Sequence, residues 1–350
     1  MTDLHAHDDP AARRALAAWG LDAAHLVPLA GGLINTTYRV DVDGRPRAVL
    51  QRLHPVFAPE VNLNLELVTA ALAARGLDTP RLLRTLDGQA WCTLEDRHWR
   101  MLSHVAGRSI EVVDSPARAA AAGTLLGRFH AALADFRAEL PCVRPPVHEP
   151  ARHFAALADA RARHPTHRLA PEVAALADEL VALHATLPAM PLQPLRLVHG
   201  DPKISNLLFD AAGAGLCMVD LDTLARAPLA FELGDAFRSW CNPGPEDAPS
   251  PGFSPALFEA ALAGYAAAGQ RFMTAEERAA VVPATAVICL ELAARFAADA
   301  LDERYFGWSP ARWPARGEHN LARARNQFAT ARAVLAARAT LETIARALLD

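Results

Sequence analysis

The chain has 350 residues, of which 52% are hydrophobic and 21% are charged, and its net charge is −4 at neutral pH. This much apolar surface excludes a disordered chain, because its burial can offset the entropy lost on ordering. The slightly acidic balance argues against sequence-independent nucleic-acid binding, which needs a basic face. The length favours two domains, or one domain of two lobes.

The N-terminal segment carries early acidic residues and no apolar core, so it is unlike a signal peptide. The most apolar stretch, residues 279–290, has about half the length of a membrane span and leads into Glu291. Five scattered cysteines without a C-x-x-C pair indicate free thiols. We therefore expect a cytoplasmic protein with neither a membrane nor a nucleic-acid partner.

The first third of the chain has the pattern of a small antiparallel sheet that carries one helix. Residues 26–53 alternate in the manner of strands, with breaks at Gly31-Gly32 and at the hairpin signal Asp43-Gly44. Residues 60–75 show apolar spacing of about 3.6, which predicts a helix that ends at Gly76. Further short strands fit residues 81–107.

From residue 116 onward the pattern becomes helical, interrupted by short strands only within residues 195–224. The Ala-rich, Leu-spaced segments predict helices over residues 116–140, 151–161, 171–187, 254–269, 275–301 and 319–349. The predicted fold is therefore α+β: a small antiparallel β-rich N-terminal lobe, residues 1–104, and a large helical C-terminal lobe, residues 105–350.

Polar side chains accompany the short strands of the second lobe. An apolar strand over residues 195–198 leads into the motif H-G-D that ends in Asp201, and Asn206 precedes another apolar run. A turn then leads to the apolar residues 216–219, which end at Asp220. This pattern predicts that Asp201, Asn206 and Asp220 lie at one edge of a hairpin.

Phosphoryl transfer requires this set of side chains. One Asp takes the proton of the acceptor hydroxyl, while an Asn and a second Asp hold Mg²⁺ through hard oxygen ligands. The spacing of Asp201 and Asn206 equals that in the kinase catalytic loop H-R-D-x-x-x-x-N. Lys203, the only lysine of the chain, can neutralise charge on the transferred group. A hairpin with merely solvated acids explains this combination less well.

The sequence resembles small-molecule kinases of the aminoglycoside phosphotransferase and choline kinase type, which have the protein-kinase-like fold. The resemblance covers most of the chain. It is most specific for the N-acetylhexosamine 1-kinases, which transfer phosphate from ATP to the anomeric hydroxyl of GlcNAc or GalNAc. The segments that carry it are GGLINTTYRV (31–40), VLQRL (49–53), WRMLSHVAG (99–107), HGDPKISNLLFD (199–210), VDLDT (219–223), ELGDAFRSWCN (232–242), RFAADALDERYF (295–306) and HNLARARNQF (319–328).

The resemblance implies ATP as the phosphoryl donor and Mg²⁺ as the metal. It implies Asp201 as the catalytic base, with Lys203 beside it, and Asn206 and Asp220 as metal ligands. The implied acceptor contacts are Asp201, Asp222, Arg295 and Tyr305. The implied nucleotide contacts are Gly31, Gly32, Asn35 and Thr36 over the phosphates, Gln51 or Arg52 on the third strand, and Met101 and Leu102 beside the adenine.

The chain departs from the family at the third strand, where the usual lysine is replaced by Gln51-Arg52. Strand alternation lets only one of the two face the nucleotide. Arg52 is the better phosphate partner, whereas alignment with the kinase motif V-A-I-K favours Gln51, so both stay open. Glu66 on the following helix can pair with either, although a solvated helix face explains it better. Asp235 is expected to accept hydrogen bonds from the catalytic-loop backbone, or to pair with Arg238.

The leading interpretation is an ATP-dependent kinase acting on the anomeric hydroxyl of an N-acetylhexosamine or related hexose. Gly200, where the hexosamine subgroup commonly has Asn, keeps other acceptors open: an aminoglycoside, choline, homoserine or another amino alcohol. A nucleotide-binding pseudokinase is supported only by the missing lysine. We expect a small-molecule partner, and a monomer or homodimer.

Overall fold

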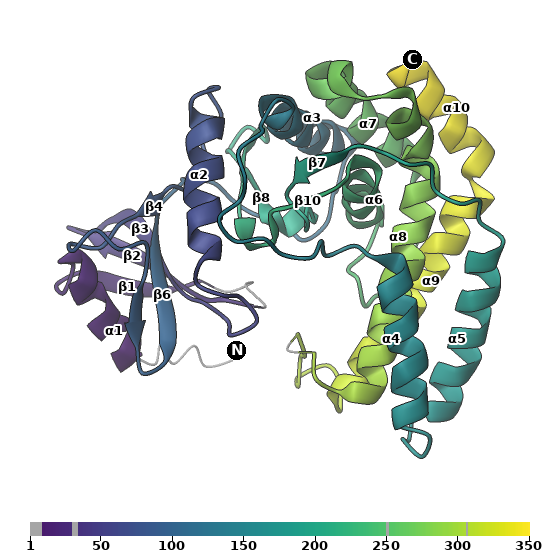
Figure 1. The fold of residues 1–350 in the computed structure, drawn as a ribbon, viewed down its shortest axis with the longest axis horizontal. Helices are drawn as coiled ribbons and strands as arrows, with labels where there is room; N and C mark the ends of the chain where they lie inside the picture. Colours follow the sequence, from purple (N-terminus) through teal and green to yellow (C-terminus); the bar gives the residue numbers. More distant parts are fainter. Residues whose placement is uncertain (1–8, 30–33, 250–251, 306) are drawn as a thin grey trace. The chain divides into compact units, whose positions relative to one another are not determined.

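The computed structural model describes residues 9–29, 34–249, 252–305 and 307–350 of the chain (Figure 1). Its internal contacts divide the chain into two compact units. Unit 1 comprises Met1–Ala106 and Arg137–Val143, and unit 2 comprises Gly107–Phe136 and Arg144–Asp350. Each unit has its own hydrophobic core and is described by itself.

Unit 1 is built on an antiparallel sheet in the strand order β1-β2-β3-β6-β4, with β5 paired to β6. The hairpin between β5 and β6 turns at Glu95 and Asp96, both in the left-handed region. The strands are β1 (His25–Pro28), β2 (Thr36–Val42), β3 (Arg45–Arg52), β4 (Leu82–Leu83), β5 (Cys92–Leu94) and β6 (Arg97–Ser103).

Two helices belong to the sheet of unit 1. Helix α1 (Pro10–Leu16), capped by the side chain of Asp9, shares a core with the sheet that includes Leu50, Trp99 and Met101. Helix α2 (Val61–Ala73) contacts the sheet from the other face, because Asn62 bonds to Arg100 of β6. Helix α2 confirms the helix expected over residues 60–75, whereas nothing in the sequence analysis predicted α1.

Unit 2 combines helices with two short two-stranded sheets. Strand β7 (Leu195–Val198) pairs with β10 (Ala225–Pro228), and β8 (Leu207–Phe209) pairs with β9 (Gly215–Met218). The helices are α3 (Pro116–Leu133), α4 (Pro150–Arg163), α5 (Ala170–Ala185), α6 (Leu229–Trp240), α7 (Pro255–Gly269), α8 (Ala275–Asp302), α9 (Arg316–Ala336) and α10 (Arg338–Leu349).

Helix α8 is the central element of unit 2. A capping box between Thr274 and Glu277 fixes its start, and most of its 28 residues are buried among α4, α5, α6 and α9. Among the described helices it alone is long and apolar enough to cross a membrane by length and composition. Because 83% of that apolar window is buried inside the protein, α8 is better explained as a core helix.

The helical predictions for unit 2 need three corrections. The segment 319–349 is two helices, divided at Ala337, where no glycine or proline marks the break. The first helix ends at Leu133 instead of residue 140. Helix α6 was not predicted, although its buried residues Leu229, Leu233, Phe237 and Trp240 recur at intervals of three or four residues.

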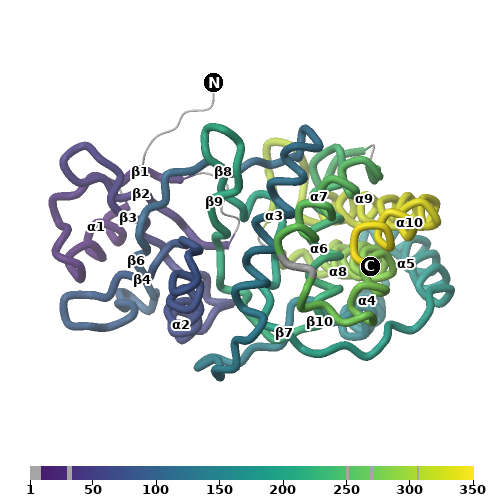
Figure 2. Tube along the Cα trace, turned by 90° about the horizontal axis from the view of Figure 1, so that it is seen from above, coloured from purple at the N-terminus to yellow at the C-terminus, as the bar shows by residue number. Residues whose placement is uncertain are grey.

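Helices α3 and α7 lie side by side and touch through their backbones (Figure 2). A Cβ atom on Gly123 of α3 would lie 1.9 Å from the carbonyl oxygen of Ala261, and one on Gly264 of α7 would lie 2.1 Å from that of Ala120. Neither position can take a larger residue unless the helices separate. Since α3 also packs on β9, this contact helps to hold the strands of unit 2 in place.

We expect Gly123→Ala to lower the free energy of unfolding by about 1–3 kcal/mol, the usual cost of overpacking a core. Urea denaturation measures it. The control is Gly252→Ala, where the new Cβ would lie 3.5 Å from Pro243, an ordinary contact. An unchanged midpoint for Gly123→Ala would contradict the observed helix contact.

Candidate active site

The turn after β7 requires glycine at position 200. Gly200 has φ +86°, and a Cβ there would lie 2.4 Å from the carbonyl oxygen of Thr223. The hydroxyl of Thr223 donates to the carbonyl of His199 (2.8 Å). The ring of His199 accepts from the amide of Asp201 at Nδ1 (3.3 Å) and contacts the carbonyl of Val219 through Nε2 (2.9 Å), which fits the tautomer protonated on Nε2. The backbone that presents Asp201 is therefore fixed from several sides.

A buried carboxylate from α6 holds this turn. Glu232, only 1% exposed, accepts the backbone N–H of His199 at Oε1 (2.8 Å) and that of Gly200 at Oε2 (2.9 Å). The prediction for Asp235 was wrong on this point, because Glu232, one turn earlier, is the backbone acceptor. Asp235 pairs instead with Arg238 (2.8 Å), as the alternative expectation had it.

Asp201, Lys203 and Asn206 converge on one another. Lys203 Nζ donates to Asp201 Oδ2 (2.7 Å), and Asn206 Nδ2 donates to the carbonyl oxygen of Asp201 (2.8 Å) and to its Oδ2 (3.2 Å). Burial by itself would lower the pKa of Lys203, but the carboxylates of Asp201 and Asp220 outweigh it and raise that pKa. Lys203 therefore stays protonated beside Asp201 at neutral pH.

Asn206 and Asp220 lie at the same end of the hairpin β8–β9. Asn206 directly precedes β8 and Asp220 follows β9 at φ +63°, while the amide of Val219 donates to the carbonyl of Asn206 (2.9 Å). The prediction that Asp201, Asn206 and Asp220 all lie at one edge of the same hairpin was wrong for Asp201. Asp201 follows β7, which pairs with β10 instead of β9, so two small sheets supply the cluster (Figure 1).

The donor set of this cluster fits a hard divalent cation. The amide nitrogen of Asn206 is turned toward Asp201, which directs its Oδ1 oxygen away, and Asp220 adds a carboxylate. Both are oxygen donors of the kind that Mg²⁺ prefers. Within the described residues no group of three or more His, Cys, Asp or Glu side chains could hold a metal. An ion here would take its remaining ligands from water or phosphate.

Two of the predicted acceptor residues lie together. The guanidinium carbon of Arg295 lies 5.8 Å from the ring centroid of Tyr305, and that of Arg323, which the sequence analysis missed, lies 5.3 Å from it. Burial raises the pKa of Tyr305, and the charges of Arg295, Arg323 and Lys203 oppose the rise. Burial also raises the pKa of Asp299, one turn beyond Arg295, to about 6.

The connector before α4 is fixed by ionic contacts. His148 is buried, with Nδ1 at 3.0 Å from Glu291 of α8 and Nε2 at 3.7 Å from Asp235 of α6. Burial would lower the pKa of His148, but the two carboxylates raise it to about 10, so the imidazole is charged. Nearby, Arg144 donates to the backbone carbonyl of Asp222, whose side chain is buried.

In unit 1, the third strand presents Gln51 and Arg52 to opposite faces of the sheet. Arg52 lies on the α1 face, where it donates to Thr36 Oγ1 (3.1 Å), lies 3.6 Å from Asp9 and stacks over Trp99. Gln51 lies on the α2 face. The carboxylate of Glu66 binds Arg84 (2.8 and 2.6 Å). This contact supports a pairing of Glu66 with neither Gln51 nor Arg52.

The other predicted nucleotide contacts are more dispersed in unit 1. Asn35 Oδ1 accepts the backbone N–H of His54 (3.0 Å). Met101 is buried in the core against α1, whereas its neighbour Leu102 lies on the opposite face of β6. Gly31 and Gly32 lie outside the described residues.

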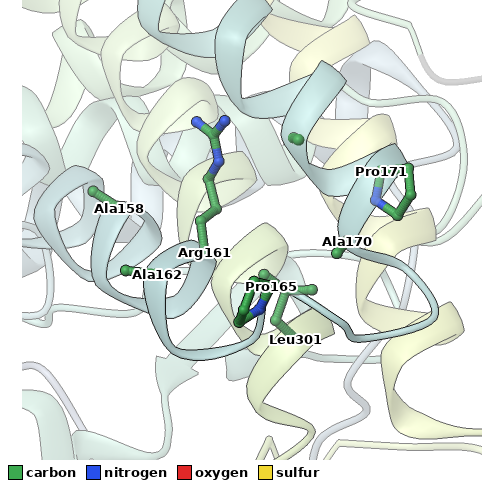
Figure 3. A pocket seen from close by; sticks show the side chains of 8 residues that line it. Ala158, Arg161, Ala162, Pro165, Ala170, Pro171 and Leu301 are labelled. Carbon is green, nitrogen blue, oxygen red and sulfur yellow. The ribbon is translucent and has the colours of Figure 1, made fainter.

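A separate pocket lies where α4 and α5 meet, and Arg161 of α4 and Leu301 of α8 are among the residues that line it (Figure 3). Its other lining residues are alanines and prolines. None of them belongs to the turns that carry Asp201, Asn206 and Asp220, so this pocket is distinct from the candidate active site.

The family model described as the phosphotransferase enzyme family matches residues 25–282. This range includes the sheet of unit 1 and the Asp201–Asp220 cluster of unit 2. The chain belongs to this family.

Among curated proteins, a homoserine kinase from Methylobacillus flagellatus is 28% identical over 227 residues. The match covers 63% of this chain and 66% of that relative, so the chain spans just under two thirds of its length. A microcompartment-associated aminopropanol kinase has a TM-score of 0.63 at 17% identity, covering 93% of this chain and 97% of that one. The amicoumacin kinase hAmiN, solved with AMP-PNP and Ca²⁺, has a TM-score of 0.60 at 14% identity, covering 87% of each chain. The predicted protein-kinase-like α+β fold is confirmed.

We expect Glu232→Gln to lower the free energy of unfolding by about 1–3 kcal/mol, because the new NH₂ group cannot accept one of the two buried backbone N–H groups. The exposed Glu259→Gln on α7 is the control. Chemical denaturation compares both with the wild type. Equal stability for the two variants would show that Glu232 does not hold the turn.

Proposed function

We propose that the chain is an ATP- and Mg²⁺-dependent kinase that transfers the γ-phosphoryl group to the hydroxyl of a small molecule. The observation that carries this proposal is the convergence of Asp201, Lys203 and Asn206 next to Asp220. Residues 1–104 are assigned to nucleotide binding, and residues 105–350 to catalysis and acceptor binding. Retention of this whole cluster argues against a pseudokinase.

In this proposal Asp201 is the general base. Its Oδ2 accepts hydrogen bonds from Lys203 and Asn206, which fixes the plane of the carboxylate and leaves Oδ1 to orient the acceptor hydroxyl and take its proton. The protonated Lys203 offsets negative charge on the transferred phosphoryl group. Asn206 and Asp220 are assigned to Mg²⁺, which supplies neutralisation of phosphate charge when bound.

The nucleotide is assigned to unit 1. The loop residues Gly31 and Gly32, with Asn35 and Thr36, are proposed to cover the phosphates, and Met101 and Leu102 to lie near the adenine. On β3 we favour Gln51 over Arg52, because Arg52 is already engaged with Asp9, Thr36 and Trp99 on the α1 face.

For the acceptor we propose the anomeric hydroxyl of an N-acetylhexosamine or related hexose. The support is the resemblance of residues 295–306 and 319–328 to hexosamine 1-kinases, together with the contact of Arg295 with Tyr305. An aromatic ring beside two guanidinium groups, those of Arg295 and Arg323, suits a polar sugar ring. An anomeric hydroxyl is also more acidic than other ring hydroxyls, so one carboxylate suffices as base.

Homoserine is the second candidate acceptor, because the curated relatives that match include homoserine kinases. An amino alcohol of this kind carries both an ammonium and a carboxylate. The mixed charges of Arg295, Asp299 and Arg323 are compatible with either type of acceptor.

We expect ATP, Mg²⁺ and N-acetylhexosamines to give a sugar 1-phosphate, identified by phosphorus NMR. The 1-O-methyl sugars are the matched controls and should not react, since their anomeric oxygen is blocked. A 6-phosphate product, or turnover of the methylated sugars, would refute anomeric transfer. Phosphorylation of homoserine alone would select the second acceptor, and no product with hexosamines, homoserine, choline or an aminoglycoside would count against the kinase proposal.

We expect Asp201→Asn to lower kcat by roughly 10²–10⁴, the usual contribution of a general base, while AMP-PNP affinity stays within a few-fold. Asp220→Asn should instead raise the Mg²⁺ concentration needed for activity, because a charged metal ligand is lost. Initial rates over a Mg²⁺ titration separate the two effects. Near-normal turnover of Asp201→Asn would show that another group is the base.

A further inference from the structure

The ring of Tyr305 lies beside two guanidinium groups from different helices of unit 2. The guanidinium carbon of Arg295 of α8 is 5.8 Å from the ring centroid, and that of Arg323 of α9 is 5.3 Å from it. The negative potential at the face of an aromatic ring attracts cations. Because two of the protein's own cations already lie at this ring, they would repel an ammonium group that an acceptor brought to the same place.

The two guanidinium groups differ in how their charge is compensated. Arg323 is buried, and its Nη1 donates to Asn320 Oδ1 (3.2 Å) and to the carbonyl of Gly307. Its Nε lies 3.7 Å from the carboxylate of Glu246. Arg295 is partly exposed, and among the residues that the structure describes no carboxylate forms an ion pair with it. An acceptor can therefore meet Arg295 as a charge without an ionic partner.

The charges that act on Tyr305 are mostly positive. Burial raises the pKa of its hydroxyl, and three cations oppose the rise: Arg295, Arg323 and Lys203. The carboxylate of Glu246 acts in the same direction as burial, but it is itself bound to Arg238 of α6 (2.6 Å). The surroundings of the ring therefore carry an excess of positive charge.

The carboxylates of α8 on either side of Arg295 offset this excess only in part. Glu291, one turn earlier, lies 3.0 Å from His148 and 3.6 Å from His153. Asp299, one turn later, is mostly buried, and burial raises its pKa to about 6. Asp299 is therefore ionised at neutral pH but offers little surface to an acceptor, so Arg295 remains the more accessible charge.

We propose that Arg295 makes the acceptor site select by charge, so that it binds alcohols that are neutral or carry a carboxylate and disfavours alcohols whose net charge is positive. A hexosamine with an acetylated nitrogen and homoserine both meet this condition. Choline and the aminoglycosides do not, because each carries an uncompensated positive charge. This inference rests on the proposed kinase function and specifies the class of acceptor for it.

Pairs of acceptors that differ in charge test this selection. For a sugar the pair is N-acetylglucosamine and glucosamine, whose amine is mostly protonated at neutral pH. For an amino alcohol the pair is homoserine and 3-aminopropanol, which lacks only the carboxylate. In whichever pair the wild type phosphorylates, we expect kcat/KM to favour the member without net positive charge by about tenfold or more, since like charges at this separation repel.

Two substitutions with opposite effects on charge separate an electrostatic role from a structural one. Arg295→Gln removes a positive charge and should lower the preference about tenfold, whereas Arg295→Lys keeps the charge and should retain the preference. Asp299→Asn removes a negative charge at nearly constant size and should raise the preference about threefold. A disturbed site would slow both members of a pair and would not shift the preference in opposite directions. The matched control is Arg332→Gln, which removes a guanidinium that lies over Phe328 of α9 (5.9 Å) and should leave the preference unchanged.

The outcomes separate the two proposals. If the wild type phosphorylates none of these acceptors and no choline or aminoglycoside, the kinase function itself fails. If it phosphorylates the positively charged member of a pair as well as its partner, or if folded Arg295→Gln keeps the wild-type preference, only the selection by charge is overturned. Should Arg295→Gln not fold, Asp299→Asn decides the matter, because an unchanged or lowered preference in that variant would also overturn the selection.

Discussion

The candidate active site depends on the hydrogen bonds that the carboxylate of Glu232 accepts. It accepts two backbone N–H groups of consecutive residues, His199 and Gly200, from within a buried helix. A buried carboxylate whose two oxygens both accept hydrogen bonds cannot rotate freely. The backbone of the turn is therefore held in a fixed position against α6. Asp201 follows this turn directly, and its side chain then needs only Lys203 and Asn206 to define its orientation. Precision at the site thus comes in part from helix α6, which contributes none of the residues assigned to the reaction.

Other residues of α6 hold the neighbouring segments of unit 2 in place. Trp240 donates its indole N–H to the carbonyl of Pro202 (2.9 Å), and Ser239 accepts the amide of Ile204 (3.1 Å). Both bonds reach the segment between Asp201 and Asn206. The same helix carries Asp235, which contacts the charged His148 and Arg238. One amphipathic helix therefore organises the turn, the loop after it and the connector before α4.

Features that depend on neighbouring residues could be predicted from the sequence. Contacts between residues far apart in the chain could not. The spacing of Asp201 and Asn206, and the periodicity of α2, depend on neighbouring residues and could be read from the sequence. Glu232 lies 33 residues from His199, and no spacing rule links an acid to a backbone N–H group at that separation. Strand alternation showed that Gln51 and Arg52 must face opposite ways, but the packing of α1 and α2 was needed to say which way.

Helix α8 carries Glu291, Arg295 and Asp299 at intervals of four residues, which places them along one face. None of the three belongs to the turns that hold Asp201, Asn206 and Asp220. Under the proposed roles, the chemistry of transfer and the choice of alcohol are encoded in separate elements of unit 2. On these proposed roles, substitutions on α8 can alter acceptor binding without changing the turns that hold Asp201, Asn206 and Asp220.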